Sequence, residues 1–278
     1  MNLIAFSLFQ ELELLGVGAL AGVLGGLFGI GGGIIMIPAM VIFLGDAYGQ
    51  DSFHVYKLAA ISTSIVLSLP AAVRHARAGA VVYRALPGIL PLTVVGVVAG
   101  VLLASLMVGE HTAVLRRVFG VFLELTVAVE IHQNWRAARG EMYFRTSSPM
   151  PTRRVVYGLI VGFPAGFVGG LLGVGGGVWA VPAQRQLLGI RIRNAIANST
   201  VMVVGIALVT AALLSYAVTR LPNPVSPWKG WWLALWLAPG ALVGGWCGAD
   251  LTHRLPVRWL RYGFQALLAL TGLRLILG

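Results

Sequence analysis

Long apolar runs separated by short polar connections make up almost the whole chain. A helix needs about 20 consecutive apolar residues to cross a membrane. The first half contains five such runs, of which the second is too short to cross alone: 12–30, 34–44, 58–73, 85–108 and 113–131. The pattern predicts an all-α polytopic membrane protein.

The second half of the chain repeats this order. Its runs are 155–174, 178–188, 195–218, 231–249 and 260–277, and the second is again short. We therefore divide one transmembrane domain into a first repeat, 1–135, a linker, 136–154, and a second repeat, 155–278. An odd number of crossings per repeat turns the second copy upside down relative to the first. The sequence thus predicts two inverted repeats of about five hydrophobic segments each.

The composition agrees with a membrane protein and excludes other classes. The 278 residues are 58% hydrophobic and 10% charged, with a mean hydropathy of +0.87, whereas soluble domains carry about 25% charged residues. The net charge of +11 does not indicate a nucleic-acid partner, because the basic residues lie between apolar runs rather than in one patch. Cys247 is the only cysteine, so the chain has no internal disulfide and no cysteine metal site.

The basic residues predict the orientation in the membrane. Numbering the connections alternately places 14 of the 20 Lys and Arg residues on one side and the remaining 6 on the other. By the positive-inside rule the first side is cytoplasmic, which makes the linker cytoplasmic and both termini periplasmic. Residues 1–11 contain no Lys or Arg. The basic region of a cleavable signal is therefore missing, and we expect the N-terminus to be retained.

Each repeat carries one glycine-rich stretch, in register with that of the other. The first holds Gly29, Gly31, Gly32 and Gly33 and is closed by Pro38; the second holds Gly173, Gly175, Gly176 and Gly177 and is closed by Pro182, 144 residues later. Glycine is unfavourable inside a helix, so each triplet predicts a break. Broken helices at membrane depth occur where the backbone is buried in protein or lines a cavity. A pair of breaks, one per half, indicates the binding site of a transporter.

The glycines admit a functional and a structural interpretation. We expect helices to start after the triplets, at Ile34 and Val178, where free N–H groups and a partial positive charge suit an anion. The short second arms favour re-entrant pairs whose tips meet near the midplane, although the sequence also allows both arms to span. The alternative is that the glycines only let helices pack closely. A phosphate-binding loop is not indicated, because no Lys-Ser/Thr pair follows either triplet.

Polar residues inside the third apolar run of each repeat are further candidates. They are Ser62, Thr63 and Ser64 in the first repeat and Asn198, Ser199 and Thr200 in the second. Hydroxyl and amide groups inside a membrane need partners, which a bound oxyanion could supply. The alternative is that they hydrogen-bond to neighbouring helices or to the preceding turn of their own helix.

Two charged residues depart from the repeat symmetry. Arg185 lies on the short arm after the second triplet, where it could attract an anion or simply snorkel to the interface. Glu124 lies inside the fifth run, where it could carry a coupling proton or pair with an arginine. No spacing of His, Asp or Glu suggests a metal site, and no motif implies a cofactor.

Together these residues carry a recognisable pattern. The chain resembles the TauE/SafE family of sulfite-exporter-like membrane proteins in three features: Gly29–Gly33 with Pro38, Gly173–Gly177 with Pro182, and the Ala/Ser/Thr-containing helices that follow them. The resemblance covers nearly the whole chain. It implies a permease of a bacterial or archaeal inner membrane for a small sulfur-containing anion such as sulfite, thiosulfate or an organosulfonate. Members of the family tend to have aliphatic residues at Gln184–Gln186 and Glu124, so these positions inherit no role.

The sequence therefore predicts a non-enzymatic secondary transporter for a small anion, coupled to protons and embedded in the lipid bilayer. The substrate-binding candidates are the glycines of the two stretches, the six polar residues and Arg185, and Glu124 is the candidate for proton coupling. An anion channel of the same architecture and a non-transporting membrane scaffold are the alternatives. The oligomeric state, the direction of transport and the identity of the anion do not follow from the sequence.

Overall fold

The structure is a computed structural model that describes residues 8–45, 52–107, 112–139, 154–220 and 226–277. Within these ranges the chain is helical and contains no strand, as the apolar runs predicted. Six helical stretches are long and apolar enough to cross a membrane. The chain is therefore an all-α polytopic membrane protein. Most of the linker, 140–153, lies outside the described residues.

The helices follow the expected order in both halves. The first half contains α1 (Leu8–Phe28), α2 (Gly33–Leu44), α3 (Ser52–Arg77), α4 (Leu86–Leu106) and α5 (Thr112–Ala138). In the second half, the equivalent of α1 is α6 (Arg154–Tyr157), a π-helical turn η2 (Gly158–Gly162) and α7 (Phe163–Leu172). The remaining elements are α8 (Gly177–Leu188), α9 (Ile192–Ala217), the short η3 (Val218–Arg220), α10 (Pro227–Arg254) and α11 (Val257–Leu277).

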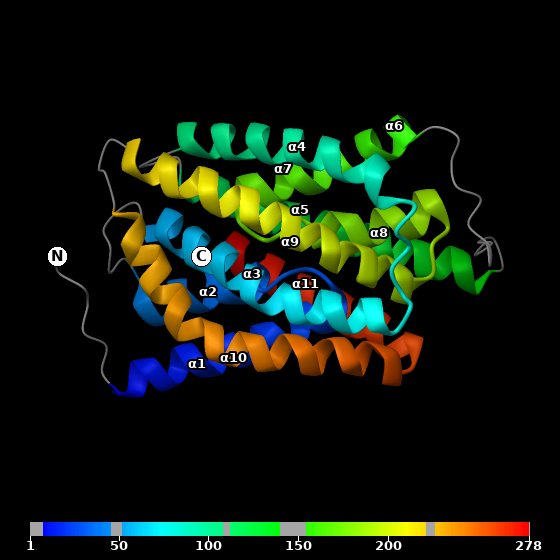
Figure 1. The fold of residues 1–278 in the computed structure, drawn as a ribbon, viewed down its shortest axis with the longest axis horizontal. Helices are drawn as coiled ribbons and strands as arrows, with labels where there is room; N and C mark the ends of the chain where they lie inside the picture. The colour runs from blue at the N-terminus through cyan, green and yellow to red at the C-terminus, as the bar shows by residue number, and fades with distance from the viewer. Residues whose placement is uncertain (1–7, 46–51, 108–111, 140–153, 221–225, 278) are drawn as a thin grey trace.

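The two halves exchange packing partners. Helix α1 packs along α10, and α7 packs along α4. In the order of the repeats, α7 is the equivalent of α1 and α4 is the equivalent of α10. Between these pairs lie α3 and α9, which contact each other, while α5 pairs with α11. Figure 1 shows α1 and α10 along one long side of the molecule and α4 and α7 along the other, with α3 and α9 between them. Neither half forms a separate body, because the principal partner of α1 and of α7 comes from the other half.

Small residues allow these exchanged helices to approach closely. A Cβ atom placed on Gly22 of α1 would lie 2.6 Å from the carbonyl oxygen of Ala241 in α10. The same atom placed on Gly166 of α7 would collide with the carbonyl oxygen of Thr93 in α4. Because hydrophobic burial does not drive helix association in lipid, close backbone contact of this kind stabilises membrane helices. The packing interpretation therefore holds for Gly22 and Gly166, which lie before the triplets.

Candidate functional site

Both glycine stretches break the helix in which they lie. Helix α1 ends at Phe28 and α2 begins at Gly33; α7 ends at Leu172 and α8 begins at Gly177. Gly31 and Gly175 have φ values of +75° and +76°, a left-handed conformation that costs other residues roughly 1–2 kcal/mol. The helix starts lie one residue before the predicted positions, within the usual uncertainty of helix ends. The two triplets therefore form two irregular tips, which we call the first tip (29–33) and the second tip (173–177).

The two tips contact each other directly. A Cβ atom placed on Gly33 would lie 2.5 Å from the carbonyl oxygen of Gly173. In the equivalent contact, a Cβ atom on Gly177 would overlap the carbonyl oxygen of Gly29. All residues of both tips are buried. Glycine is required at these positions because the backbones of the two halves cross with no room for a side chain.

This crossing brings two helix N-termini together. Ile35 and Met36 donate to the carbonyl of Gly32, at 3.1 and 3.0 Å, and the amides of Trp179 and Ala180 donate to Gly176 in the same way. The first amides of each helix have no acceptor within the helix. Each N-terminus also carries a partial positive charge. The arrangement can therefore stabilise a negative charge between the halves.

Two of the predicted hydroxyl groups reach the first tip. The Oγ of Ser64 on α3 accepts a hydrogen bond of 3.3 Å from the amide of Gly32 and donates one of 2.8 Å to Ala60. The Oγ of Ser199 on α9 donates a hydrogen bond of 2.6 Å to the carbonyl of Gly29. Both side chains are buried. The first tip is thus held by one hydroxyl from each half.

The other predicted polar residues have different surroundings. Thr63 and Thr200 each donate to the carbonyl four residues earlier in their own helix, at 2.9 Å. The amide nitrogen of Asn198 donates to Gln184 at 3.0 Å, and its oxygen accepts from the amide of Val82 at 2.7 Å. These three residues therefore hydrogen-bond to other groups of the protein, as in the alternative interpretation of the polar residues given above. The Oγ of Ser62 is buried and has no hydrogen-bond partner within the described part of the chain.

A buried lysine, Lys57, lies beside the second tip. In the count of basic residues that predicted the orientation, Lys57 was one of the residues in the connections between apolar runs. Lys57 of α3 is fully buried, and its Nζ donates a hydrogen bond of 2.6 Å to the carbonyl of Leu171, near the end of α7. A Cβ atom on Gly173 would lie 3.1 Å from the Cβ of Lys57. A cation is favourable at the C-terminus of a helix. The signal available in the sequence was a lysine five residues before the polar cluster, in the place that Arg193 takes in the second repeat.

Arg185 lies inside the protein and not at the interface. Its side chain is 2% exposed and sits in α8, next to Gln184, whose side chain bonds to Asn198. The snorkelling alternative is therefore wrong, because snorkelling requires the guanidinium group to reach water. Arg185 remains a candidate for anion recognition.

Glu124 lies where α5 packs on α11. A Cβ atom placed on Gly272 of α11 would lie 2.5 Å from the Oε1 atom of Glu124. Among the described residues this oxygen has no hydrogen-bond partner, although it is buried. A carboxylate oxygen in this position is costly unless it is paired or protonated. Glu124 therefore remains a candidate for carrying a proton.

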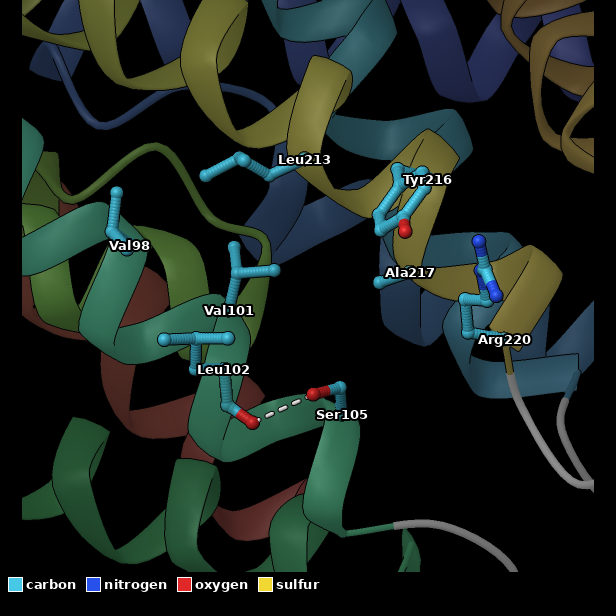
Figure 2. Close-up of a pocket in the computed structure, with 8 residues that line it drawn as sticks. All are labelled: Val98, Val101, Leu102, Ser105, Leu213, Tyr216, Ala217 and Arg220. Atoms are coloured by element: carbon cyan, nitrogen blue, oxygen red, sulfur yellow. Dashed lines mark hydrogen bonds between the residues drawn. The ribbon is translucent and has the colours of Figure 1, made fainter.

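A groove on the outside of the helix bundle is distinct from the tips. It has a volume of about 230 Å³ and lies between α4 and the end of α9. Figure 2 shows Leu102 and Leu213 along it, with Arg220 and the ring of Tyr216 near one end. Leu213 is 13 residues beyond Thr200, or about 20 Å along the helix. The groove is thus separate from the crossing of the tips.

Comparison with known proteins gives one family. Residues 14–275 match the family described as "Sulfite exporter TauE/SafE". A "Probable membrane transporter protein" of Haemophilus influenzae is 27% identical over 94% of this chain and 96% of its own length. "Probable membrane transporter protein YunE" of Bacillus subtilis is 24% identical, with 94% of this chain and 95% of the relative covered.

Two of the relatives are considerably longer than the matched region. "Probable membrane transporter protein MamO" of Magnetospirillum gryphiswaldense is 31% identical over 95% of this chain, but the match covers 45% of the relative. The chain thus spans about half the length of that protein. No solved structure matches the chain.

Proposed function

The chain belongs to the TauE/SafE sulfite exporter family, and from that premise we propose that it is a proton-coupled secondary transporter for a small sulfur-containing anion. Sulfite, thiosulfate and small organosulfonates are the substrates that fit this proposal. The chain is a multi-pass membrane protein of a transporter family; this conclusion rests on the family match, the named relatives and the six apolar helices.

The observation that carries the proposal is the contact between the two tips. Gly33 meets Gly173, and Gly177 meets Gly29, so that the N-termini of α2 and α8 lie at one crossing. An oxyanion removed from water needs several donors, and each charge-assisted hydrogen bond contributes roughly 1.5–3 kcal/mol. We place the anion beside this crossing, in a state in which the two halves have moved apart, with backbone amides of the tips as principal donors and the hydroxyls of residues 62–64 and 199–200 as secondary ones.

Lys57 and Arg185 add positive charge to this region in the proposal. Both are buried, and Lys57 packs against Gly173 of the second tip. Opposite charges separated by about 8 Å or less attract by roughly 2 kcal/mol or more at an effective dielectric constant of 20. This is enough to favour an anion over a neutral molecule, while the backbone groups provide the directional contacts.

The exchange of packing partners supports inverted repeats. Helices α1 and α7 pack on equivalent helices of the opposite half, which a two-fold relation between the repeats would produce. We propose that this axis lies in the membrane plane, that α2 and α8 are re-entrant arms, and that both termini are periplasmic. Alternating access would then require the two halves to move against each other at the tips.

Flux measurements on the purified protein in proteoliposomes test the proposed function. We expect saturable uptake of sulfite or thiosulfate that responds to an imposed pH gradient, with sulfate as a comparison. Flux that does not saturate and ignores the pH gradient would favour the anion channel. Absence of both flux and binding for the whole panel of anions would leave the scaffold as the better interpretation.

A further inference from the structure

Two histidine rings form a direct hydrogen bond between the two halves of the protein. The Nδ1 atom of His75 on α3 lies 3.0 Å from the Nε2 atom of His253 on α10. The ring planes are inclined at 69°. His75 is fully buried and His253 is half-buried. The pair therefore extends from the protein interior toward the ends of α3 and α10.

The hydrogen bonds assign the protons of both rings. The Nε2 atom of His75 lies 3.4 Å from the carbonyl oxygen of Gly26, which can only accept, so this nitrogen carries a hydrogen. In neutral His75 the Nδ1 atom is then an acceptor, and His253 must donate from Nε2. The Nδ1 atom of His253 is left as a free acceptor within the described part of the chain. The two rings are thus aligned in one direction, from His253 to His75.

The inner end of this pair lies on the helix that leads to the first tip. Gly26 is in the last turn of α1, three residues before Gly29. Thr252, the neighbour of His253, donates to the carbonyl of Leu27 at 2.8 Å in the same turn. The rings and the threonine therefore connect α3 and α10 to the segment whose carbonyl at Gly29 is held by Ser199.

Charged groups surround the outer end of the pair. Arg74 of α3 donates to Asp250 of α10 at 2.9 Å, and Arg254 pairs with the other oxygen of Asp250 at 2.5 Å. Arg193 of α9 also faces His253 and donates to the carbonyl of Leu255 at 3.0 Å. Asp250 is occupied by two arginines, and the net positive charge opposes a lasting additional charge on the rings. A proton that reaches the pair is therefore held weakly and released readily.

We propose that His253 and His75 form the proton relay that couples anion transport to proton movement. A hydronium proton binds Nδ1 of His253, and the Nε2 proton of His253 moves to Nδ1 of His75. His75 then carries the positive charge while its Nε2–H still donates to the carbonyl oxygen of Gly26, and the reverse transfers return the proton to water. The first step breaks an O–H bond of hydronium as it forms an N–H bond, and the second breaks one N–H bond as it forms another, so water is the only other reactant. Chains of histidine and carboxylate groups within membranes serve as such relays. This inference rests on the proposed transport function and assigns the coupling path to residues other than Glu124.

Paired transport assays in proteoliposomes test the relay. Sulfite and thiosulfate serve as probes, one readout being exchange of labelled anion across the membrane and the other the change of internal pH during net anion flux. We expect His75→Gln and His253→Gln to reduce proton movement per anion at least tenfold while exchange persists. His132→Gln is the matched control, because His132 is exposed on α5 and stacks near Trp135.

The outcomes separate the relay from the transport function. Unchanged proton movement in both histidine variants, with exchange intact, overturns the relay alone. Loss of proton movement in Glu124→Gln with normal coupling in the histidine variants does the same. If the wild-type protein exchanges no anion and moves no proton, both proposals fail.

A second measurement does not depend on transport or on a variant that must fold. In the wild-type protein labelled with ¹⁵N-histidine, we expect a scalar coupling between Nδ1 of His75 and Nε2 of His253, which assigns the shared proton. Absence of this coupling, with both rings protonated on other nitrogens, overturns the relay.

Discussion

The Nζ atom of Lys57 donates a hydrogen bond of 2.6 Å to the carbonyl oxygen of Leu171, which joins α3 of the first half to the last turn of α7 in the second. The equivalent carbonyl in the first half, Leu27, is held by the hydroxyl of Thr252 at 2.8 Å. Corresponding helix ends are therefore held by a cation on one side of the crossing and by a neutral group on the other. The positive charge beside the tips is asymmetric.

Replacing Lys57 with methionine tests this charge. The buried cation disappears while the volume is largely kept, so we expect anion affinity to fall at least tenfold, or about 1.4 kcal/mol. The change in thermal stability should be smaller, because the lost hydrogen bond is offset by removal of a buried charge. Binding of sulfite, measured by calorimetry, checks the prediction against Lys229→Met, a substitution in the first turn of α10. Equal affinities in both variants would exclude Lys57 from anion recognition.

Equivalent glycines of the two tips should respond differently to substitution. Gly176 has a φ of +73°, and a Cβ atom there would collide with the carbonyl oxygen of Ala165. Gly32 has a φ of −83°, and its Cβ atom would meet the flexible ends of Met36 and Leu67. We expect Gly176→Ala to cost more than the roughly 1–2 kcal/mol of left-handed strain.

Gly32→Ala should cost less, because side chains can move aside and the backbone is not strained. Thermal denaturation of the two variants in detergent measures the difference. A larger loss for Gly32→Ala than for Gly176→Ala would contradict this account of the tips.

Ser199 and Thr63, one from each group of predicted polar residues, make different contacts and should contribute differently to anion binding. Ser199 donates to the carbonyl of Gly29 in the first tip, whereas Thr63 bonds only to Ala59 in its own helix. Ser199→Ala should therefore weaken anion binding by about tenfold, the loss of roughly one hydrogen bond. Thr63→Val keeps the shape of the side chain and should leave the affinity within about twofold. The reverse order of effects would show that the site is organised by Thr63.

The orientation in the membrane is open to a labelling experiment. Cys247 is exposed, so a Cys247→Ala background is needed before single cysteines are introduced. A cysteine in the linker should resist a membrane-impermeant maleimide added to intact cells, because the positive-inside rule makes this segment cytoplasmic. One placed after Leu277 should react. Labelling of the linker from outside would reverse the proposed topology.

The sequence by itself determined the helices, the duplication and the breaks. These are local properties: apolar length fixes which segments can cross a membrane, and consecutive glycines interrupt a helix wherever they occur. The constant offset of 144 residues from Gly31 to Gly175 and from Pro38 to Pro182 required only a comparison of the chain with itself. The same comparison of the two copies named Ser64 and Ser199 among six polar candidates.

Only the tertiary structure decided which side chains meet. Lys57 contacts Leu171 across 114 residues of chain, and His75 contacts His253 across 178. Such contacts depend on how helices are rotated about their axes and on the exchange of partners between halves, which the apolar pattern does not specify because most faces of a membrane helix are apolar. For the same reason the sequence could not separate Ser199, which reaches the first tip, from Thr63, which bonds to its own helix. The burial of Lys57 likewise follows from its contact with the end of α7 and the second tip in the other half.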